Sequence, residues 1–186
     1  PAFRSPLWPV KRIGDVIAAA VALVLLSPLL LVLALVNRVV DGPGVIFRQE
    51  RIGVDGKPFE LLKFRSLRPA TSNESATKWN IKNDDRVSWY GKFLRKSSLD
   101  ELPQLVNILR GDMAIVGPRP ERPHFTEQFS EIYPYYGSRH RVPCGLTGWA
   151  QIHGLRGDTS IAGRARFDNF YIENWSLWLD FKIVLR

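Results

Sequence analysis

The chain has very little cysteine and histidine, and this scarcity excludes several kinds of site. Cys144 is its only cysteine, so no internal disulfide can form and a reducing compartment is expected. As a nucleophile Cys144 has little support, and we expect it to be a small packed residue. The three histidines, His124, His140 and His153, are scattered without metal-ligand spacing. Bound zinc is therefore not expected.

Acidic residues are also scarce relative to basic ones. The 26 Lys and Arg against 18 Asp and Glu give a net charge of +8 and an isoelectric point near 9.9. Such a balance suits an anionic partner, which could be phospholipid head groups, nucleotide phosphates or nucleic acid. The sequence contains no helix-turn-helix pattern, no zinc-finger spacing and no aromatic RNA-binding signature, so nucleic acid is not the expected partner.

One run without any charged residue, Val16–Asn37, stands out against this composition. It is long enough for a transmembrane helix, since about 20 apolar residues cross a hydrocarbon core of about 30 Å. Ser27-Pro28 lies in its middle. The proline ring clashes with the Val24 carbonyl and cannot donate a hydrogen bond to it, and the Ser27 hydroxyl could donate to that carbonyl instead. Basic residues flank both ends, which favours keeping both in the cytoplasm. We expect a re-entrant helix–break–helix, with a kinked ordinary span as the alternative.

The rest of the chain predicts short elements of both kinds. Strands are expected at Val45–Phe47 and Phe59–Phe64, joined by a hairpin turn at Asp55-Gly56. The polar stretch Thr71–Asn83 resembles a long loop. Helical patterns follow at Arg86–Lys96, Leu102–Leu109 and Phe125–Tyr136, and the aromatic and basic stretch Phe167–Arg186 could be an interfacial or a core-packing helix. The expected fold class is a membrane-associated α/β protein, mainly helical, with a small β-hairpin region.

Two cations alternate at the end of the second predicted strand. Lys63 and Arg65 share one face there, because side chains alternate along a strand. Together they could bind a phosphate, and a solvated edge is the alternative.

Adjacent carboxylates, Asp100 and Glu101, come just before the predicted helix Leu102–Leu109. Asp100 could be a helix N-cap, or Ser98 and Glu101 could form a capping box. Alternatively, a carboxylate at a helix N-terminus stays ionised and suits a nucleophile. Its neighbour could ligate Mg²⁺ together with substrate phosphates, and Arg95 close by favours a phosphate. The spacing alone leaves both interpretations open.

Several segments in a fixed order make the chain resemble a known family. They are Ser27-Pro28, Lys63–Leu67, Leu94–Gln104 and Gly111–Pro120. With these, the chain resembles the bacterial sugar transferases, the monotopic phosphoglycosyl transferases, from about Lys11 to Arg186. The stretch Tyr171–Asp180 is similar to long-form members, which often transfer glucose 1-phosphate. Because such members carry extra N-terminal membrane helices and a further domain, the chain is expected to be a fragment of a longer protein.

This resemblance implies an activity, a location and partners. The expected reaction moves a sugar 1-phosphate from a UDP-sugar to polyprenyl (undecaprenyl) phosphate, which initiates exopolysaccharide, capsule or O-antigen synthesis. Glucose is the expected sugar, with galactose or an N-acetylated sugar as alternatives. Residues 1–40 would form the re-entrant membrane element, and residues 41–186 the catalytic domain on the cytoplasmic face of the bacterial inner membrane. The oligomeric state is left open, with a homodimer as one possibility.

The resemblance also assigns roles to single residues. Asp100 would be the nucleophile, and Glu101 would ligate Mg²⁺ and assist deprotonation of the acceptor. Lys63, Arg95 and Arg119 match family positions near the phosphates, Asp168 matches an acidic position, and Pro28 would set the membrane break. One departure is Pro143-Cys144, where the family usually has Lys-Pro. Two alternatives to an enzyme stay open, a membrane-anchored basic binding module and a catalytically silent scaffold.

Overall fold

The computed structural model describes residues 5–67, 87–157 and 159–186. The predicted loop Thr71–Asn83 lies outside these ranges. The described elements, in chain order, are α1 (Trp8–Val40), β1 (Ile46–Ile52), η2 (Val54–Gly56), β2 (Pro58–Phe64), α3 (Trp89–Ser97), η3 (Leu99–Glu101), α4 (Gln104–Arg110), β3 (Met113–Val116), α5 (Pro123–Ile132), η4 (Tyr136–Arg141), β4 (Cys144–Thr147), α6 (Trp149–Ile152), α7 (Ile161–Glu173) and α8 (Leu177–Val184). The described part of the protein is therefore mainly helical, with two small sheets.

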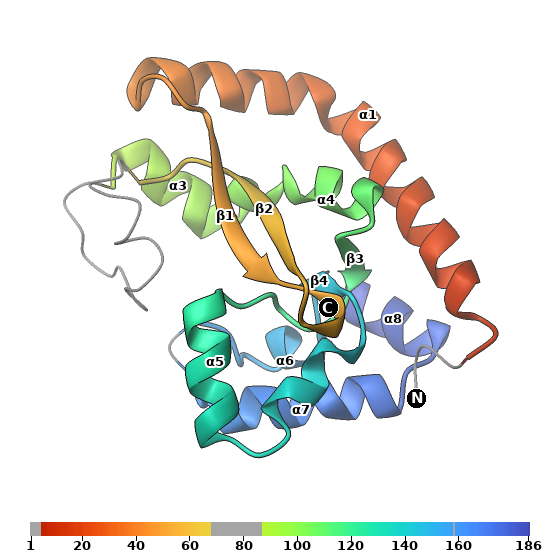
Figure 1. Cartoon of the computed structure of the whole chain (residues 1–186). Coiled ribbons are helices and arrows are strands. Elements are labelled where there is room, and N and C mark those ends of the chain that lie inside the picture. Colours follow the sequence, from red (N-terminus) through yellow and green to blue (C-terminus); the bar gives the residue numbers. More distant parts are fainter. Residues whose placement is uncertain (1–4, 68–86, 158) are drawn as a thin grey trace.

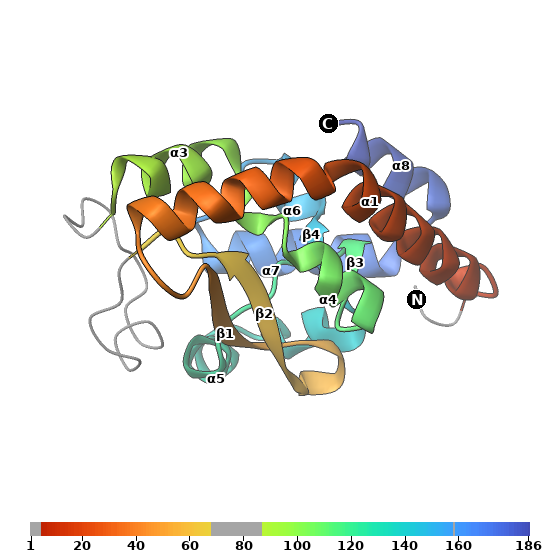
Figure 2. The ribbon, with the colours of Figure 1, turned by 90° about the horizontal axis from the view of Figure 1, so that it is seen from above.

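The apolar run forms one long helix that is bent and continuous. Pro28 lies inside α1, and the helix continues through it without an interruption. Both views show the helix axis bending part-way along (Figures 1 and 2), and a proline is a common cause of such a bend. The Ser27 hydroxyl donates to the Val24 carbonyl at 2.8 Å, which gives that carbonyl the partner it was expected to need. The predicted break between two separate half-helices is thus a bend within a single helix.

One face of α1 packs on the rest of the protein along most of its length. Near its start, the Arg12 guanidinium donates to the Ile108 carbonyl at 2.7 Å. Ala19 packs in a cluster with Leu105 and Ile108, and further along the Tyr90 hydroxyl donates to the Leu33 carbonyl at 2.8 Å. The opposite face is open, and α1 is long and apolar enough to cross a membrane.

The predicted hairpin is present and longer than expected. β1 and β2 pair antiparallel, with Ile46 opposite Phe64 and Ile52 opposite Pro58. The turn at η2 depends on Asp55 and Gly56, which both have a positive φ, a backbone region that Gly and Asp tolerate better than most residues. This Asp-Gly signal placed the turn correctly.

A second sheet of two short strands was not predicted. β3 and β4 pair in parallel, with Met113 opposite Cys144 and Val116 opposite Thr147. Just past β3, Gly117 passes so close to β4 that a Cβ on Gly145 would lie 2.1 Å from the Gly117 nitrogen. This close approach fixes the path of the segment that follows β3.

The C-terminal stretch packs one side of its last helix into the core, and its other side is exposed. It forms two helices, α7 and α8, where a single stretch was considered. Leu179 and Ile183 of α8 are buried in a core cluster with Tyr171 and Ile172, whereas Trp178 and Phe181 are exposed. In Figure 2, α8 and α3 lie on the same side of the molecule as α1, and α5 lies on the other side.

Candidate active site

Asp100 and Glu101 lie on a tight turn between two helices. Ser98 ends α3 with a φ of 57° and reverses the chain into η3. Neither η3 nor α4 has a side-chain capping hydrogen bond, and the N-cap position of α4 is taken by Pro103. The capping interpretation of the two carboxylates is therefore wrong, and their side chains are left for other contacts.

Lys63 reaches this turn because α4 is fastened to its strand. The fully buried Asn107 of α4 donates to the Glu60 carbonyl at 2.7 Å and accepts from the Leu62 N–H at 3.0 Å. Its amide thus replaces a neighbouring strand along that edge of β2. The Lys63 ammonium then donates to Glu101 Oε1 at 2.7 Å.

Arg119 reaches the same oxygen from the segment that follows β3. Its guanidinium donates to Glu101 Oε1 at 2.8 Å. The segment is held to β4, because the Gly117 N–H donates to the Thr147 carbonyl at 2.9 Å and the Gly145 N–H donates to the Pro118 carbonyl at 2.8 Å. Cys144 belongs to the pair Pro143-Cys144, where the family that the sequence resembles usually has Lys-Pro. It is buried at the start of β4, and its thiol contacts the Ile52 carbonyl at 3.4 Å.

The three side chains form a cluster with more positive than negative charge. Burial alone would raise the pKa of Glu101, but the charges of Arg119 and Lys63 outweigh it and hold that pKa well below its usual value. Burial lowers the pKa of Lys63 against the opposing charge of Glu101. Glu101 therefore stays ionised at neutral pH. Lys63, Arg119 and the nearby Arg95 together outnumber the two carboxylates, which suits a phosphate.

Asp100 is the more buried of the two carboxylates, with 8% of its surface exposed. Burial raises its pKa, while the charges of Lys63 and Arg95 act in the opposite direction. A carboxylate that is poorly solvated and close to cations is well suited to attack an electrophile that carries negative charge. Arg95 lies on α3, where its Nε donates to the Ser66 hydroxyl at 2.8 Å.

Two further predicted site residues lie apart from this cluster. Arg65 donates to the carbonyls of Pro43, Asp41 and Gly42, so it fastens the chain at the end of α1. It does not join Lys63 at the cluster, because its guanidinium binds these carbonyls whereas the Lys63 ammonium binds Glu101. Asp168 is buried on α7 and forms an ion pair with Arg139 at 2.7 Å.

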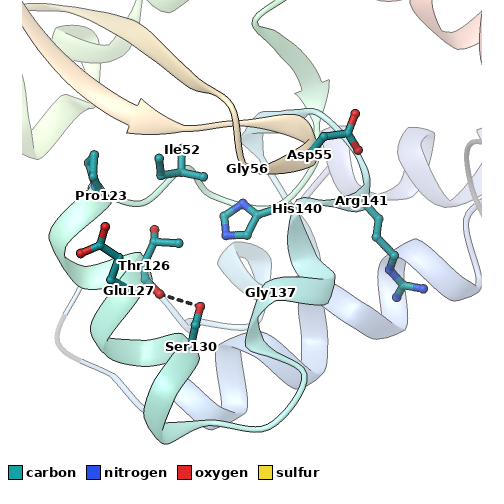
Figure 3. Close-up of a pocket in the computed structure, with 10 residues that line it drawn as sticks. All are labelled: Ile52, Asp55, Gly56, Pro123, Thr126, Glu127, Ser130, Gly137, His140 and Arg141. Carbon is teal, nitrogen blue, oxygen red and sulfur yellow. Dashed lines mark hydrogen bonds between the residues drawn. The ribbon is translucent and has the colours of Figure 1, made fainter.

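A cavity of about 480 Å³ lies beside α5, η4 and the hairpin turn. Figure 3 shows the His140 ring in it, with Thr126 and Ser130 of α5 on the opposite wall. Burial and the Arg139 charge lower the pKa of His140 to about 4, against a smaller raising effect of the Gly53 backbone. The hairpin turn and Lys63 are near opposite ends of β2, so this cavity is separate from the Glu101 cluster.

Comparison with known proteins decides the family. The family model of the bacterial sugar transferases matches residues 7–186. The chain belongs to the bacterial sugar transferase family. Its relatives include the UDP-glucose:undecaprenyl-phosphate glucose-1-phosphate transferases of Escherichia coli (strain K12) and of Caulobacter vibrioides, at 44% and 45% identity over 99% and 95% of this chain.

Not every relative of this sugar transferase is named for glucose. The UDP-N-acetylgalactosamine-undecaprenyl-phosphate N-acetylgalactosaminephosphotransferase of Aeromonas hydrophila is 41% identical over 98% of the chain. The chain spans 41% of the Escherichia coli relative and 44% of the Aeromonas one, but 67% of the Caulobacter one.

Few side chains within the described part of the chain could hold Mg²⁺. Within the described ranges there is no group of three or more His, Cys, Asp or Glu side chains that could hold a metal. Mg²⁺ is commonly held by one or two carboxylates together with substrate phosphates. Asp100 and Glu101 fit this arrangement of carboxylates with substrate phosphates, in which a bound diphosphate would supply further ligands.

The sequence analysis did not identify the residues that hold the segments carrying Lys63 and Arg119 in place. Asn107 fastens β2 to α4, and Arg139 donates to the Arg119 carbonyl at 2.7 Å. Arg51 donates to the Pro120 carbonyl at 3.1 Å from the other side. An isolated Asn or Arg gives no local signal, because each acts through a contact with residues that are distant in the chain.

Proposed function

We propose that this protein transfers a sugar 1-phosphate from a UDP-sugar to undecaprenyl phosphate and so initiates polysaccharide synthesis. The observation that carries the proposal is the buried Asp100 beside Glu101, with Lys63 and Arg119 bound to that second carboxylate. The names of the relatives support the same chemistry.

The reaction has two displacements at one phosphorus atom. A carboxylate oxygen of Asp100 attacks the sugar-bearing phosphorus of the donor, and the bond from that phosphorus to the bridging oxygen breaks. UMP leaves, and the sugar phosphate stays on Asp100 as an acyl phosphate. An oxygen of undecaprenyl phosphate then attacks the same phosphorus. The aspartyl bond breaks, which frees Asp100 and yields the undecaprenyl diphosphate sugar.

The neighbouring side chains bind charge and move a proton. Lys63 and Arg119 change partner from Glu101 to the donor phosphates, and Arg95 favours the same anion near Asp100. The released Glu101 carboxylate assists deprotonation of the acceptor phosphate and, with Asp100 beside it, would hold Mg²⁺. When bound with the donor, Mg²⁺ supplies positive charge against the diphosphate.

Glucose is the proposed sugar, with an N-acetylated sugar or galactose as alternatives. Relatives named for UDP-glucose support it, and the Aeromonas relative keeps the alternative open. The test is a panel of UDP-sugars with undecaprenyl phosphate and Mg²⁺, followed by UMP release. We expect UDP-glucose to turn over fastest. Turnover of UDP-N-acetylgalactosamine with none of UDP-glucose would contradict the choice of sugar, and no turnover of any donor would contradict the activity.

We also propose that α1 enters and leaves the membrane on the cytoplasmic side. The part of the protein that follows α1 contacts this helix near both of its ends. Lys11 binds Asp180, and Asn37 donates to the Arg65 carbonyl. If α1 crossed the bilayer, the helices packed along it would also lie in hydrocarbon. The open face of α1, with Val24 and Leu25 each 72% exposed, would instead dip into one leaflet.

Exposed aromatic residues on the helices beside α1 support this placement. Trp89 on α3 and Trp178 on α8 are 69% and 63% exposed, and the Lys182 ammonium lies 5.9 Å from the centre of the Trp178 ring. Tryptophan with a nearby lysine is typical of a membrane interface. Residues 1–40 would then be the membrane element and residues 41–186 the catalytic part at the cytoplasmic surface.

Cysteine labelling tests this topology in the full-length protein in cells. Single cysteines are placed beside Arg12 and beside Arg38 in a background without Cys144. We expect an impermeant thiol reagent applied from the periplasm to label neither position, and both to react after the inner membrane is opened. Labelling of one position from the periplasm would establish a true span.

A further inference from the structure

Arg139 and Asp168 form a buried ion pair, and the Arg139 guanidinium makes further hydrogen bonds. Their side chains are 1% and 2% exposed. One carboxylate oxygen of Asp168 accepts a hydrogen bond from Nε of Arg139 at 3.0 Å and lies 2.7 Å from Nη2 in the ion pair. Nη1 of Arg139 donates to the Tyr136 hydroxyl at 2.8 Å. The guanidinium is therefore held at three of its nitrogen atoms, in an orientation that its planar shape makes rigid.

The same guanidinium reaches the Arg119 segment. Nη2 of Arg139 also donates to the Arg119 backbone carbonyl at 2.7 Å. The side chain of that same Arg119 donates to Glu101 at 2.8 Å. Arg119 thus links the buried pair to Glu101, because its backbone contacts Arg139 and its side chain contacts Glu101.

We infer that Arg139, oriented by Asp168 and Tyr136, is a positioning residue that sets where the Arg119 guanidinium lies. The inference rests on the proposed function only in that Arg119 binds the donor phosphates. Asp168 then acts from α7 through two other residues and does not touch the substrate. This gives the acidic position a role that the sequence could not assign.

The physical reason is the geometry of a guanidinium fork. Nη2 lies in the ion pair with Asp168 and donates to the Arg119 carbonyl, so one nitrogen atom links the two groups. A lysine at position 139 would keep the charge but could not reproduce this fixed fork. A small displacement of a side chain that binds the reacting group can cost about 100-fold in rate, so the support of Arg119 should appear in catalysis.

A double-mutant cycle with Arg119 tests the inference. In otherwise wild-type protein, Asp168→Asn should lower kcat/KM for UDP-glucose by about tenfold or more. In an Arg119→Ala background, the same change should lower it by less than about threefold, because the residue through which it acts is gone. Equal losses in both backgrounds would overturn the inference.

A matched control separates positioning from stability. Ile172→Ala removes a fully buried apolar side chain on the same helix, α7. It should lower the melting temperature, and any change it makes in kcat/KM should be the same in both backgrounds. If Asp168→Asn does not fold, Tyr136→Phe removes one acceptor of Arg139 without changing shape, and the same cycle is run with it.

Amide hydrogen exchange gives a measurement that does not depend on activity. Asp168→Asn or Tyr136→Phe should speed exchange in residues 117–122, and Ile172→Ala should leave the rate in that segment close to the wild-type rate. Unchanged exchange there in both variants would overturn the inference. Faster exchange in a protein that turns over no UDP-sugar would support positioning and contradict the proposed function.

Discussion

Two carboxylates, Glu101 and Asp180, form ion pairs that differ in the number of cations around them and in the exposure of those cations. Glu101 accepts from two cations, and the side chain of one of them, Arg119, is 33% exposed. Asp180 accepts from Lys11, the Tyr171 hydroxyl and the Trp175 ring N–H, at 2.7, 2.6 and 3.1 Å. Lys11 is also shared with Asp15 at 3.3 Å, so positive charge is not in excess there.

This contrast separates contacts that can be exchanged from contacts that hold the fold. Around Glu101 the side chains are 17–33% exposed, so the two cations can turn to an incoming phosphate, which supplies the negative charge in place of Glu101. Around Asp180 the lysine is 3% exposed, and the carboxylate also accepts from two other side chains, so losing it would break a buried network even though Lys11 keeps Asp15. We therefore expect changes at the first site to affect catalysis and changes at the second to affect stability.

The largest expected effect is at the first site, with Asp100→Asn. Asparagine keeps the shape but removes the anion that we propose as the nucleophile, so turnover should fall by about 1,000-fold or more. Stability should change by less than about 1 kcal/mol, since burial already disfavours the charge that is removed. Steady-state UMP release and chemical unfolding measure the two quantities. Near-normal turnover in this variant would remove Asp100 from the mechanism.

At the second site, Asp180→Asn should give the reverse result. Lys11 keeps Asp15 at 3.3 Å, but it loses the closer charge at 2.7 Å. The Tyr171 hydroxyl and the Trp175 N–H lose a charged acceptor as well, so the free energy of unfolding should fall by about 3–5 kcal/mol. The turnover of the protein that remains folded should stay within about threefold of the wild-type value. If turnover collapses while stability is kept, the contrast between the two carboxylates is wrong.

The pH dependence of stability adds a third, smaller effect that involves neither carboxylate. The pKa of His140 is lowered from 6.5 to about 4 in the folded protein by burial and the Arg139 charge. The folded state therefore disfavours protonation, so stability is full above pH 6.5 and is lost as the pH falls towards 4. The loss attributable to this residue should be about 3 kcal/mol.

The control for this effect is His140→Gln, which does not titrate in that range. Unfolding free energies of both proteins are measured between pH 7 and pH 4. The wild-type curve should fall more steeply than that of the variant over this window. Parallel curves would show that the imidazole keeps its ordinary pKa in the folded state.

The smallest effect is expected from an exposed ion pair on the hairpin. Arg48 and Glu60 lie 3.0 Å apart, but their side chains are 63% and 48% exposed. Water and salt screen such a pair, so Arg48→Gln should change the free energy of unfolding by less than about 0.5 kcal/mol. A loss as large as that of Asp180→Asn would mean that burial does not separate the two kinds of ion pair.

Local signals in the sequence predicted local structure well. The Asp55-Gly56 turn, the α4 helix and the bond from Ser27 to Val24 all depend on neighbours in the chain. The parallel pairing of β3 with β4 could not be predicted, because each strand has four residues and the two are far apart in the sequence. The contact of Arg139 with the Arg119 carbonyl depends on that same fold.

The site itself was only partly accessible from the sequence. Adjacent carboxylates could be recognised, but spacing alone did not distinguish capping from catalysis, and the turn geometry at Ser98 decides against capping. The expected pair of Lys63 and Arg65 does not form, because Arg65 binds carbonyls at the end of α1, a contact that depends on how the chain folds back.

The covalent role of Asp100 is tested most directly by a single turnover without acceptor. The full-length protein in a membrane-like environment is mixed with UDP-glucose and Mg²⁺, and undecaprenyl phosphate is omitted. We predict a rapid release of UMP equal to the enzyme present, with the glucose phosphate found on Asp100 by mass spectrometry and no release from Asp100→Asn. UMP release that requires undecaprenyl phosphate, or an equal burst from Asp100→Asn, would contradict the covalent mechanism.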